Sequence, residues 1–332
     1  MSMLFLSESD MKKAIDMGEA IDALEEAFRM HSRKETITPL RTHLELEEVG
    51  GMGLFMPSWV APIKALGIKA ITVYPENPQK GLPFIQGTVL LYNGDTGAQE
   101  AILEASYITR LRTGASCGVA TRRLAPQGSE RAAIIGAGAQ SFMQMWAVIT
   151  AAPTVREYYI FDLERAKAEA LKKDAEAAFP EIKFSLASSS AEAVARAQVI
   201  TTATTSKKPV FSIKDLQEEK AHINAVGAFK PEMQEIDAAV MQKADKLFVD
   251  DYEGALAESG DLIIPLNDGR LRKEDISGEI GEVLLGTKKG REESDRITVY
   301  ETVGMGSLDV VTAKAIFKKA LAGEIGTRLS LH

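Results

Sequence analysis

The chain has 332 residues, enough for two domains, and is 45% hydrophobic and 26% charged, as ordinary soluble globular proteins are. This composition excludes a disordered or fibrous protein; no apolar run approaches the ~20 residues of a membrane helix, and the N-terminus lacks the basic segment of a secretory signal. A net charge of −8, from 47 acidic and 39 basic residues, argues against nucleic acid or an anionic membrane as a partner.

The first part of the chain predicts helices followed by a β-rich region. Polar residues with an acid three positions later begin helices at Ser7 and Asp16, and apolar residues keep a helical spacing up to His31. From Thr38 the period changes to two, which predicts a strand with one polar face. The remaining elements expected here are strands at 53–60, 66–74, 86–92 and 98–104, a turn at 93–97 and a helix at 106–124.

Strands alternate with helices after Pro126. Strands are expected at 131–135, 158–162, 182–186, 199–203, 222–226 and 246–249, with helices such as 142–151, 164–179 and 191–197 between them. Repeated βα units predict an α/β fold with a Rossmann-type doubly wound parallel sheet. A strand at 297–302 and a helix at 308–321 follow, and this last helix is expected to return to the N-terminal region.

A glycine-rich turn follows the first of these strands. The sequence Gly136-Ala137-Gly138-Ala139-Gln140-Ser141 links strand to helix, which is the context of the dinucleotide fingerprint. Gly136 allows the tight turn, Gly138 lets the backbone approach a pyrophosphate, and the helix N-terminus offers N–H groups to the phosphates. Asp162 ends the second strand, where an acid binds the adenosine ribose and repels a 2′-phosphate. NAD is therefore the expected cofactor, although Arg165 nearby keeps NADP open.

Conventional catalytic groups are scarce. One cysteine, Cys117, and four histidines without close spacing predict neither a disulfide nor a metal site, and fit a cytoplasmic protein. Lys69 shares a strand face with Ile71 and Val73, and the opposite face looks no more solvated, so its ammonium is expected to be partly buried. Burial lowers the pKa of a lysine and suits it to proton transfer or carboxylate binding; the alternative is a lysine reaching solvent at a sheet edge.

Two arginines are candidates for the same pocket. Arg41 is expected on the polar face of the alternating strand together with His43, and Arg112 lies in the helix that leads into the nucleotide-type units. With Lys69 they would form a cationic pocket in which arginine binds a carboxylate through two parallel hydrogen bonds. The alternative for each arginine alone is a surface ion pair.

Six stretches, in order along nearly the whole chain, resemble the ornithine cyclodeaminase/mu-crystallin family, which includes archaeal-type alanine dehydrogenases and cyclic ketimine reductases. The stretches are Gly67-Ile68-Lys69, Tyr74-Pro75-Glu76-Asn77-Pro78 with Gly81-Leu82-Pro83, Leu111-Arg112-Thr113-Gly114-Ala115, Gly136-Ala137-Gly138-Ala139-Gln140, Asn224-Ala225-Val226-Gly227-Ala228, and Thr302-Val303-Gly304-Met305-Gly306 with Asp309.

The resemblance implies an organisation and a set of roles. Residues 1–117 with 305–332 would form an α+β substrate-binding and dimerisation domain, residues 118–304 the NAD(P)-binding Rossmann domain, and the protein a homodimer. Arg41, Lys69 and Arg112 would bind the carboxylate of a small amino or imino acid, with Lys69 close to the reacting carbon. The implied dinucleotide contacts are Arg112, Thr113, Ala139, Gln140, Asp162, Thr202, Val226, Gly227 and Val303.

One loop departs from the family pattern. Cyclodeaminases and the related alanine dehydrogenases have an acid–base aspartate there, whereas Phe229 holds that place here and cannot transfer a proton. The expected activity is therefore hydride transfer at the α-carbon of a small amino or cyclic imino acid, as in a ketimine reductase or an amino-acid dehydrogenase. Ornithine cyclodeamination with bound NAD and a non-catalytic, crystallin-like binding protein are the alternatives. Glu232 and Glu235 are candidate replacement acids, unless both are simply solvated.

Overall fold

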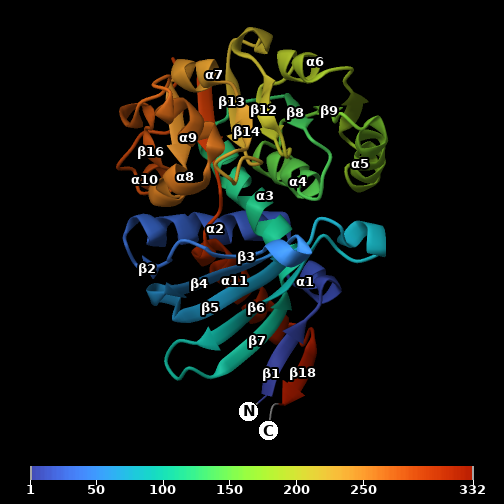
Figure 1. Cartoon of the computed structure of the whole chain (residues 1–332), viewed down its shortest axis with the longest axis vertical. Helices are drawn as coiled ribbons and strands as arrows, with labels where there is room; N and C mark the ends of the chain where they lie inside the picture. Colours follow the sequence, from blue (N-terminus) through green and yellow to red (C-terminus); the bar gives the residue numbers. More distant parts are fainter. Residues whose placement is uncertain (1, 331–332) are drawn as a thin grey trace. The chain divides into compact units, whose positions relative to one another are not determined.

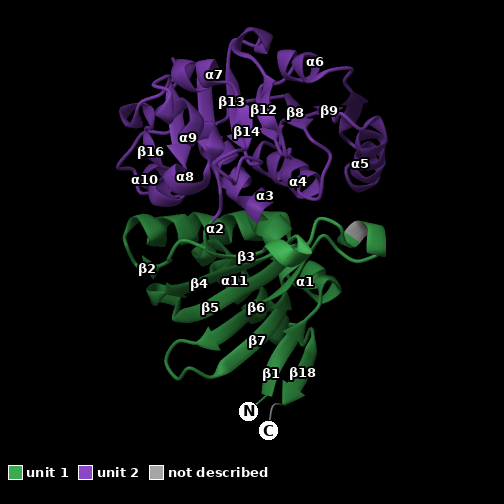
Figure 2. Cartoon of the chain, viewed as in Figure 1, with its two compact units in different colours: residues 1–112, 305–332 green, residues 113–304 purple. Residues whose placement is uncertain are grey.

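The structure, a computed structural model, describes residues 2–330 without the side chain of Pro78. Met1, Leu331 and His332, which the expected first domain includes, lie outside the described residues. Contacts divide the chain into unit 1, residues 1–112 with 305–332, and unit 2, residues 113–304 (Figure 2). The division falls within helix α3 (Ala105–Leu124), and the boundary expected after Cys117 lies further along the same helix.

Unit 1 is built on an eight-stranded sheet in the order β18-β1-β7-β6-β5-β4-β2, with β3 also paired to β4 (Figure 1). Its strands are β1 (Ser2–Leu6), β2 (Thr36–Ile37), β3 (Thr42–Leu46), β4 (Gly51–Val60), β5 (Ala65–Val73), β6 (Ile85–Asn93), β7 (Gln99–Glu104) and β18 (Thr327–Ser330). Its helices are α1 (Glu8–Ala14), α2 (Met17–Ser32), α11 (Gly306–Ala322) and the first part of α3. The sequence did not predict β1, because Ser2–Leu6 shows no alternation of polar and apolar residues.

Local signals account for the helix positions in this unit. Ser7 caps α1 and Asp16 caps α2, each by accepting a hydrogen bond from the backbone N–H three residues later, so the two predicted starts are confirmed. Helix α11 packs on β4, β5 and β6 and beside α2. The last helix therefore returns to the N-terminal region, as expected from its position after the nucleotide-type units.

The middle of this sheet is covered by α11 on one face. Gly67, Lys69 and Ile71 of β5 are buried on that side, whereas Leu66 and Thr72 on the opposite side are exposed. The prediction that neither face of this strand meets solvent is therefore wrong for the second face. The prediction of a one-sided strand after Thr38 is also wrong, because all five residues of β3 are exposed: β3 lies outside the main strand path and pairs with β4.

Unit 2 contains an eight-stranded parallel sheet in the order β10-β9-β8-β11-β13-β17-β15-β16. Its strands are β8 (Arg131–Ile135), β9 (Glu157–Phe161), β10 (Lys183–Leu186), β11 (Val199–Thr202), β13 (Ala221–Ala225), β15 (Lys246–Val249), β16 (Gly278–Glu279) and β17 (Ile297–Glu301), and a separate pair is formed by β12 (Lys207–Phe211) and β14 (Gln234–Ile236). Its helices are the rest of α3, α4 (Ser141–Ala151), α5 (Arg165–Ala178), α6 (Ser190–Ala195), α7 (Ala238–Lys243), α8 (Tyr252–Glu258), α9 (Gly260–Asn267) and α10 (Ile280–Leu284).

This sheet is buried on both faces, as a Rossmann-type fold requires. Ala132 and Ile134 of β8 pack with α4 and α5, while Ala133 and Ile135 pack with α6 and α7 on the other side. The order β10-β9-β8-β11-β13 matches the dinucleotide-binding order 3-2-1-4-5, which reverses between β8 and β11. The expected Rossmann-type sheet is therefore confirmed, and its ligand crevice is expected at the carboxyl ends of these strands.

No helix in the described part of the chain combines the length and the apolar character needed to cross a membrane.

Candidate active site

Lys69 lies in the middle of the unit 1 sheet, directly under α11. It is opposite Met56 of β4 and Val89 of β6, so strands flank it on both sides. A Cβ at Gly67 would approach Val310 of α11 to 2.8 Å, which shows how closely the helix lies on this strand. The glycine two residues before Lys69 thus lets α11 reach the lysine.

Asp309 in the first turn of α11 joins two cations in this buried place. Its Oδ2 lies 2.7 Å from Lys69 Nζ, and its Oδ1 accepts a hydrogen bond of 3.1 Å from Arg112 Nε on α3. The exposed fractions are 1% for Lys69, 0% for Asp309 and 6% for Arg112. We call these three residues the charged cluster of unit 1.

The surroundings set the protonation of Lys69. Burial lowers its pKa to about 7; the neighbouring Asp309 opposes this shift, and the positive charges of Arg112 and Arg41 reinforce it. Both the ammonium and the neutral amine are therefore accessible near neutral pH. The predicted burial of Lys69 is confirmed and is more complete than the sequence indicated.

The three cations predicted from the sequence all belong to unit 1. Lys69 and Arg112 are joined through Asp309, while half-buried Arg41 directly precedes β3 and acts on Lys69 through its charge. The sequence placed Asp309 in a family motif without giving it a role. Its position in the first turn of a helix, where an acid is favoured, was the available signal; its partners became visible only when α11 was seen on β5.

The glycine-rich turn of unit 2 has the features of a dinucleotide site. Gly136 has φ +101°, and a Cβ there would meet Ala203 O at 2.5 Å, so the tight turn requires glycine. A Cβ at Gly138 would meet nothing within 4 Å, which leaves room for a ligand beside the backbone. Ser141, at the place of the usual third glycine, is buried and donates a hydrogen bond of 2.9 Å to Gly136 O.

Polar groups around this turn also fit a dinucleotide. Asp162 follows β9 and accepts a hydrogen bond of 2.7 Å from Ala137 N, so its carboxylate is fixed beside the turn. The Oε1 atom of Gln140 is buried and has no hydrogen-bond partner in the described part of the chain. Such an orphaned acceptor next to an open turn is explained when a ligand supplies the missing donor.

The other residues implied in cofactor contact are distributed around the same unit. Thr202 ends β11, Val226 and Gly227 follow β13, and Val303 follows β17, so these four lie at the carboxyl edge of neighbouring strands. Thr113 is buried on α3 where unit 2 begins, and Ala139 is exposed in the turn.

The two candidate replacement acids that follow Phe229 in the sequence have different surroundings. Glu232 is exposed, whereas Glu235 is completely buried and both of its carboxylate oxygens accept hydrogen bonds. Phe229 itself is 39% exposed. Lys69, whose pKa lies at about 7, is a further titratable candidate for proton transfer.

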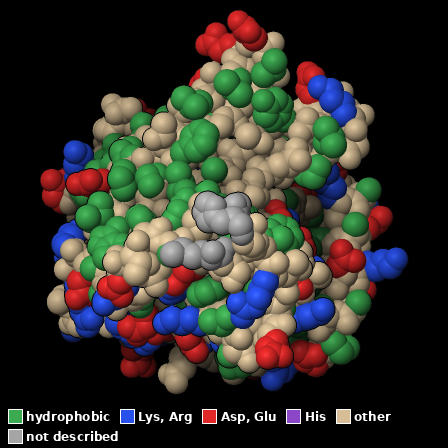
Figure 3. Space-filling view, turned by 90° about the horizontal axis from the view of Figure 1, so that it is seen from below, with side chains coloured by type: hydrophobic (Ala, Val, Ile, Leu, Met, Phe, Trp, Pro, Cys, Tyr) green, Lys and Arg blue, Asp and Glu red, His purple; other side chains and the backbone are tan. Residues whose placement is uncertain are grey.

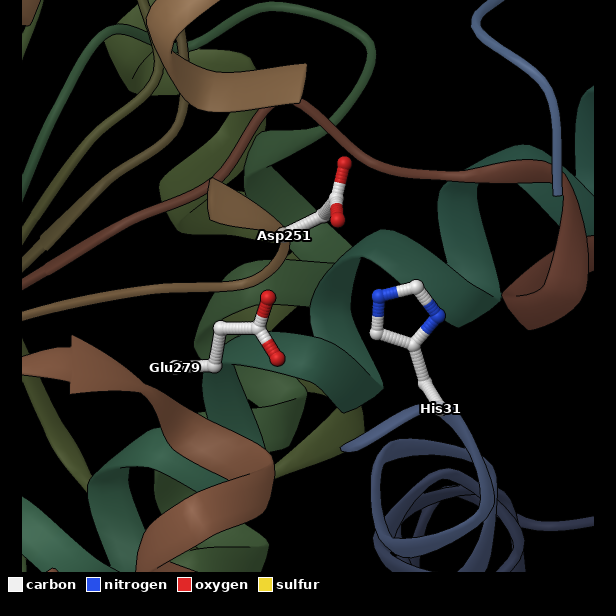
Figure 4. Close-up of side chains that lie close together, drawn as sticks. All are labelled: His31, Asp251 and Glu279. Atoms are coloured by element: carbon white, nitrogen blue, oxygen red, sulfur yellow. The ribbon is translucent and has the colours of Figure 1, made fainter. Parts of the chain in front are cut away.

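Figure 4 labels three further side chains with metal-binding chemistry, Asp251 and Glu279 of unit 2 and His31 of unit 1. Asp251 caps α8 by accepting a hydrogen bond of 2.7 Å from Gly254 N. Glu279 accepts one of 3.3 Å from Tyr252 N, and His31 Nδ1 lies 3.0 Å from Thr36 Oγ1. Each side chain thus has a structural role within its own unit.

The similarity of the chain to known proteins extends over both units. The sequence model of the ornithine cyclodeaminase/mu-crystallin family matches residues 1–324. The chain belongs to this family. A Δ1-pyrroline-2-carboxylate reductase of Bacillus cereus is 37% identical over 327 residues, which cover 98% of this chain and 99% of the relative.

Two solved structures of the family superpose on nearly the whole chain. The Δ1-pyrroline-2-carboxylate reductase of Thermococcus litoralis, in complex with NADH and L-proline, has a TM-score of 0.93 and 38% identity and covers 98% of this chain and 99% of its own. An archaeal alanine dehydrogenase dimer with bound NAD has a TM-score of 0.92 and 33% identity and covers 100% of both chains. The expected class, a nicotinamide-dependent oxidoreductase of amino or imino acids, is thereby confirmed.

Proposed function

We propose that this family member reduces a cyclic imino acid, pyrroline-2-carboxylate or a close analogue, with NADH. The observation that carries the proposal is the buried charged cluster of unit 1, in which Lys69 has a pKa of about 7. Similarity over the full chain to pyrroline-2-carboxylate reductases supports the same substrate class. Unit 1 would bind the substrate and unit 2 the cofactor.

Arg112 and Arg41 would bind the substrate carboxylate. Arg112 donates a hydrogen bond from Nε to Asp309. A guanidinium has five N–H donors in a rigid fork, so the remaining N–H groups of Arg112 suit the carboxylate of a substrate. Asp309 fixes the direction of this fork because it is buried and cannot exchange its partners for water. The substrate ring would thereby be oriented before reaction, and fixed orientation lowers the barrier of a transfer step substantially.

Unit 2 would hold the dinucleotide at the turn after β8. Gly136 and Gly138 would let the backbone approach the pyrophosphate, and Asp162 would bind the adenosine ribose. A carboxylate at that place repels a 2′-phosphate, which supports NADH over NADPH. When bound, the reduced nicotinamide supplies the hydride for the imine carbon.

Lys69 would hold the proton needed by the substrate nitrogen. An imine nitrogen that gains a hydride at the neighbouring carbon becomes an amine, and protonation makes that carbon a better hydride acceptor. The Lys69 ammonium can give this proton near neutral pH because its neutral form is equally accessible there. Phe229 has no proton to offer, which supports a reduction over cyclodeamination, a reaction with more proton transfers.

A substrate panel read by two signals tests this proposal. Cyclic imino acids, pyruvate with ammonia, and ornithine would each be incubated with the protein and NADH or NAD, while cofactor absorbance and ammonia are followed together. We expect NADH consumption with a five- or six-membered cyclic imino acid. Ammonia release from ornithine without net cofactor change would instead identify a cyclodeaminase, and tight NADH binding without any turnover would identify a binding protein.

We also propose that a second copy of the chain covers the open face of the unit 1 sheet. The open face carries an apolar row in which Trp59 is opposite Leu66, and Leu66 is opposite Tyr92, each exposed or half-buried. Leu44 on β3 adds to this face and is 51% exposed. Contiguous exposed apolar patches mark interaction surfaces, and the similar alanine dehydrogenase is a dimer. Figure 3, which views the molecule from below, shows hydrophobic side chains interspersed with charged ones on the face that it draws.

The dimer is tested by placing a charge on the open face. Leu66→Glu is expected to convert a dimer into a monomer in analytical ultracentrifugation, since a carboxylate would be buried unpaired at the interface. Leu163→Glu is the matched control, because Leu163 lies in unit 2 and is 94% exposed. A wild-type protein that is monomeric at all concentrations would contradict the proposal.

A cytoplasmic location is also proposed. It is supported by the single cysteine, Cys117, which is buried in the structure.

A further inference from the structure

Glu235 connects the two loops that follow the central strands of unit 2. Its Oε1 accepts a hydrogen bond of 2.5 Å from Thr204 N in the loop after β11. Its Oε2 accepts one of 2.9 Å from Thr202 Oγ1 and one of 2.6 Å from Gly227 N in the loop after β13. A single carboxylate therefore holds the ends of two neighbouring strands.

The two loops lie too close together for larger residues. A Cβ at Gly227 would meet Thr204 O at 2.2 Å and the Glu235 carboxyl carbon at 2.6 Å. Val226 N also donates a hydrogen bond of 3.1 Å to Thr202 O. The position of each loop thus depends on the other and on the Glu235 side chain.

The backbone of Glu235 is itself fixed by Asp261 on α9. Asp261 Oδ1 accepts hydrogen bonds of 2.7 Å from Glu235 N and 2.8 Å from Ile236 N. The neighbouring Gly260 allows this approach, because a Cβ there would meet Met233 O at 1.9 Å. An unbroken series of hydrogen bonds therefore connects α9 through β14 to the two loops.

Burial raises the pKa of all three acids of this region, Glu235, Asp261 and Glu301, and at Glu235 the hydrogen bonds from Thr204, Thr202 and Gly227 oppose this shift. Backbone N–H groups can only donate, so both oxygens of Glu235 act as acceptors. Asp261 Oδ2 and Glu301 Oε2 have no hydrogen-bond partner in the described part of the chain. Burial and the neighbouring carboxyls raise the pKa of both groups well above the ordinary range, so these two oxygens suit the protonated form.

We propose that Glu235 is a positioning residue for the nicotinamide half of the cofactor, acting through Thr202, Val226 and Gly227. In sheets of this order the second mononucleotide half binds over the strands beyond the switch point, which here are β11 and β13. The inference rests on the proposed function in one respect, the identity of the dinucleotide. Because fixed donors already occupy both of its oxygens, Glu235 does not suit the role of proton donor that the sequence left open.

Glu235→Gln tests this role because it keeps the shape of the side chain and removes one acceptor oxygen. The amide NH2 then faces a backbone N–H, and one of the two loops loses its anchor. We expect the dissociation constant of NADH, measured from the fluorescence of the bound nicotinamide, to rise about tenfold or more. The affinity for ADP-ribose, which binds the turn at Gly136 and lacks the nicotinamide, should change less than about twofold. Exposed Glu232→Gln is the matched control and should bind both like the wild type.

The difference between the loss of affinity for NADH and the loss for ADP-ribose decides the outcome. Unchanged NADH affinity, or an equal loss for NADH and ADP-ribose, would overturn the proposal, since the second result indicates a general disturbance of unit 2. If Glu235→Gln does not fold, Thr202→Val removes one donor at nearly constant volume and should give a smaller loss with the same split. A wild type that binds NADH yet reduces no imino acid would refute the proposed function and leave this binding test valid.

Discussion

The two units bury charge in opposite ways. In unit 1, Asp309 lies between Lys69 and Arg112, so a buried anion has two cationic partners. In unit 2, Asp261 and Glu301 are completely buried among carboxyl groups; Asp261 accepts hydrogen bonds from two backbone N–H groups, and Glu301 accepts one from the Ser259 hydroxyl. Both arrangements are expensive in free energy, and each is made tolerable by different chemistry.

The difference indicates which unit holds a buried group that can gain and lose a proton near neutral pH. Pairing in unit 1 allows charged groups to persist in a buried place and leaves the pKa of Lys69 at about 7. In unit 2, burial and mutual repulsion raise the pKa values of Asp261 and Glu301, so protonation replaces pairing. The first arrangement suits catalysis, and the second holds backbone segments in place.

The largest effect is expected when the positive charge of Lys69 is removed from unit 1. Lys69→Met keeps the length of the side chain without its charge, and we expect kcat to fall about 1000-fold, the usual range for a lost proton donor. NADH affinity should be retained, because the turn at Gly136 lies in unit 2. Lys64→Met is the control, since Lys64 is exposed and pairs with Asp95. Near-normal turnover of Lys69→Met would refute its role.

Replacing Asp309, the carboxylate shared by Lys69 and Arg112, tests whether ion pairing stabilises unit 1. Asp309→Asn keeps the shape, leaves Arg112 without its buried counter-ion and lowers the pKa of Lys69 further, at a cost of about 3–5 kcal/mol in the free energy of unfolding. Thermal denaturation should show a melting temperature lower by about 10 °C. Asp95→Asn, at an exposed ion pair, should change little. A melting temperature equal to that of the wild type would show that the cluster does not stabilise unit 1.

The pH dependence of the reaction sharpens the assignment of the proton. For imine reduction, kcat/KM should fall as the pH rises through about 7, because Lys69 loses the proton that the nitrogen needs. The reverse oxidation should increase over the same range. Arg112→Gln should move the fall to higher pH, since the Arg112 charge lowers the pKa of Lys69.

A control on the same helix separates this electrostatic effect from a general one. Arg110→Gln removes a charge that pairs with Glu8 and should leave the inflection in place. An inflection that is the same in Arg112→Gln and in the wild type would exclude Lys69 as the titrating group.

The smallest effect is expected in unit 2. Glu301→Gln replaces a carboxyl whose pKa is raised well above its ordinary value by burial and by Asp261. In the wild type the folded state keeps this proton while the unfolded state releases it above about pH 4.3, so stability falls as the pH rises from there toward the folded pKa. The variant lacks this loss, and its melting temperature should stay within about 3 °C of the wild type at pH 7 and decline less toward pH 9.

Exposed Glu274→Gln is the control for this substitution and should follow the wild-type curve. A large loss of stability in Glu301→Gln at neutral pH would show that Glu301 is ionised in the folded protein, and the two units would then bury charge in the same way.

Local chemistry made much of the fold predictable. Seven of the eight strands of the parallel sheet in unit 2 were predicted to within one residue at each end, because each is a short apolar run between turn signals. The two-residue strand β16 and the separate pair of β12 and β14 were not predicted. The glycine turn at Gly136 was identified by its strand and helix context. Strand β1 was missed because it gains its partners, β7 and β18, from distant parts of the chain.

The sequence by itself determined the residue types and their order: the glycines of the turn, Asp162 after β9, and a lysine in an apolar strand. Tertiary structure alone decided that Asp309, 240 positions after Lys69 in the numbering, becomes its counter-ion, and that one carboxylate, Glu235, joins two loops. The physical reason is that a buried charge or an unpaired N–H must find a partner wherever packing brings one. That partner is set by which helix lies on which strand, and spacing along the chain does not record it.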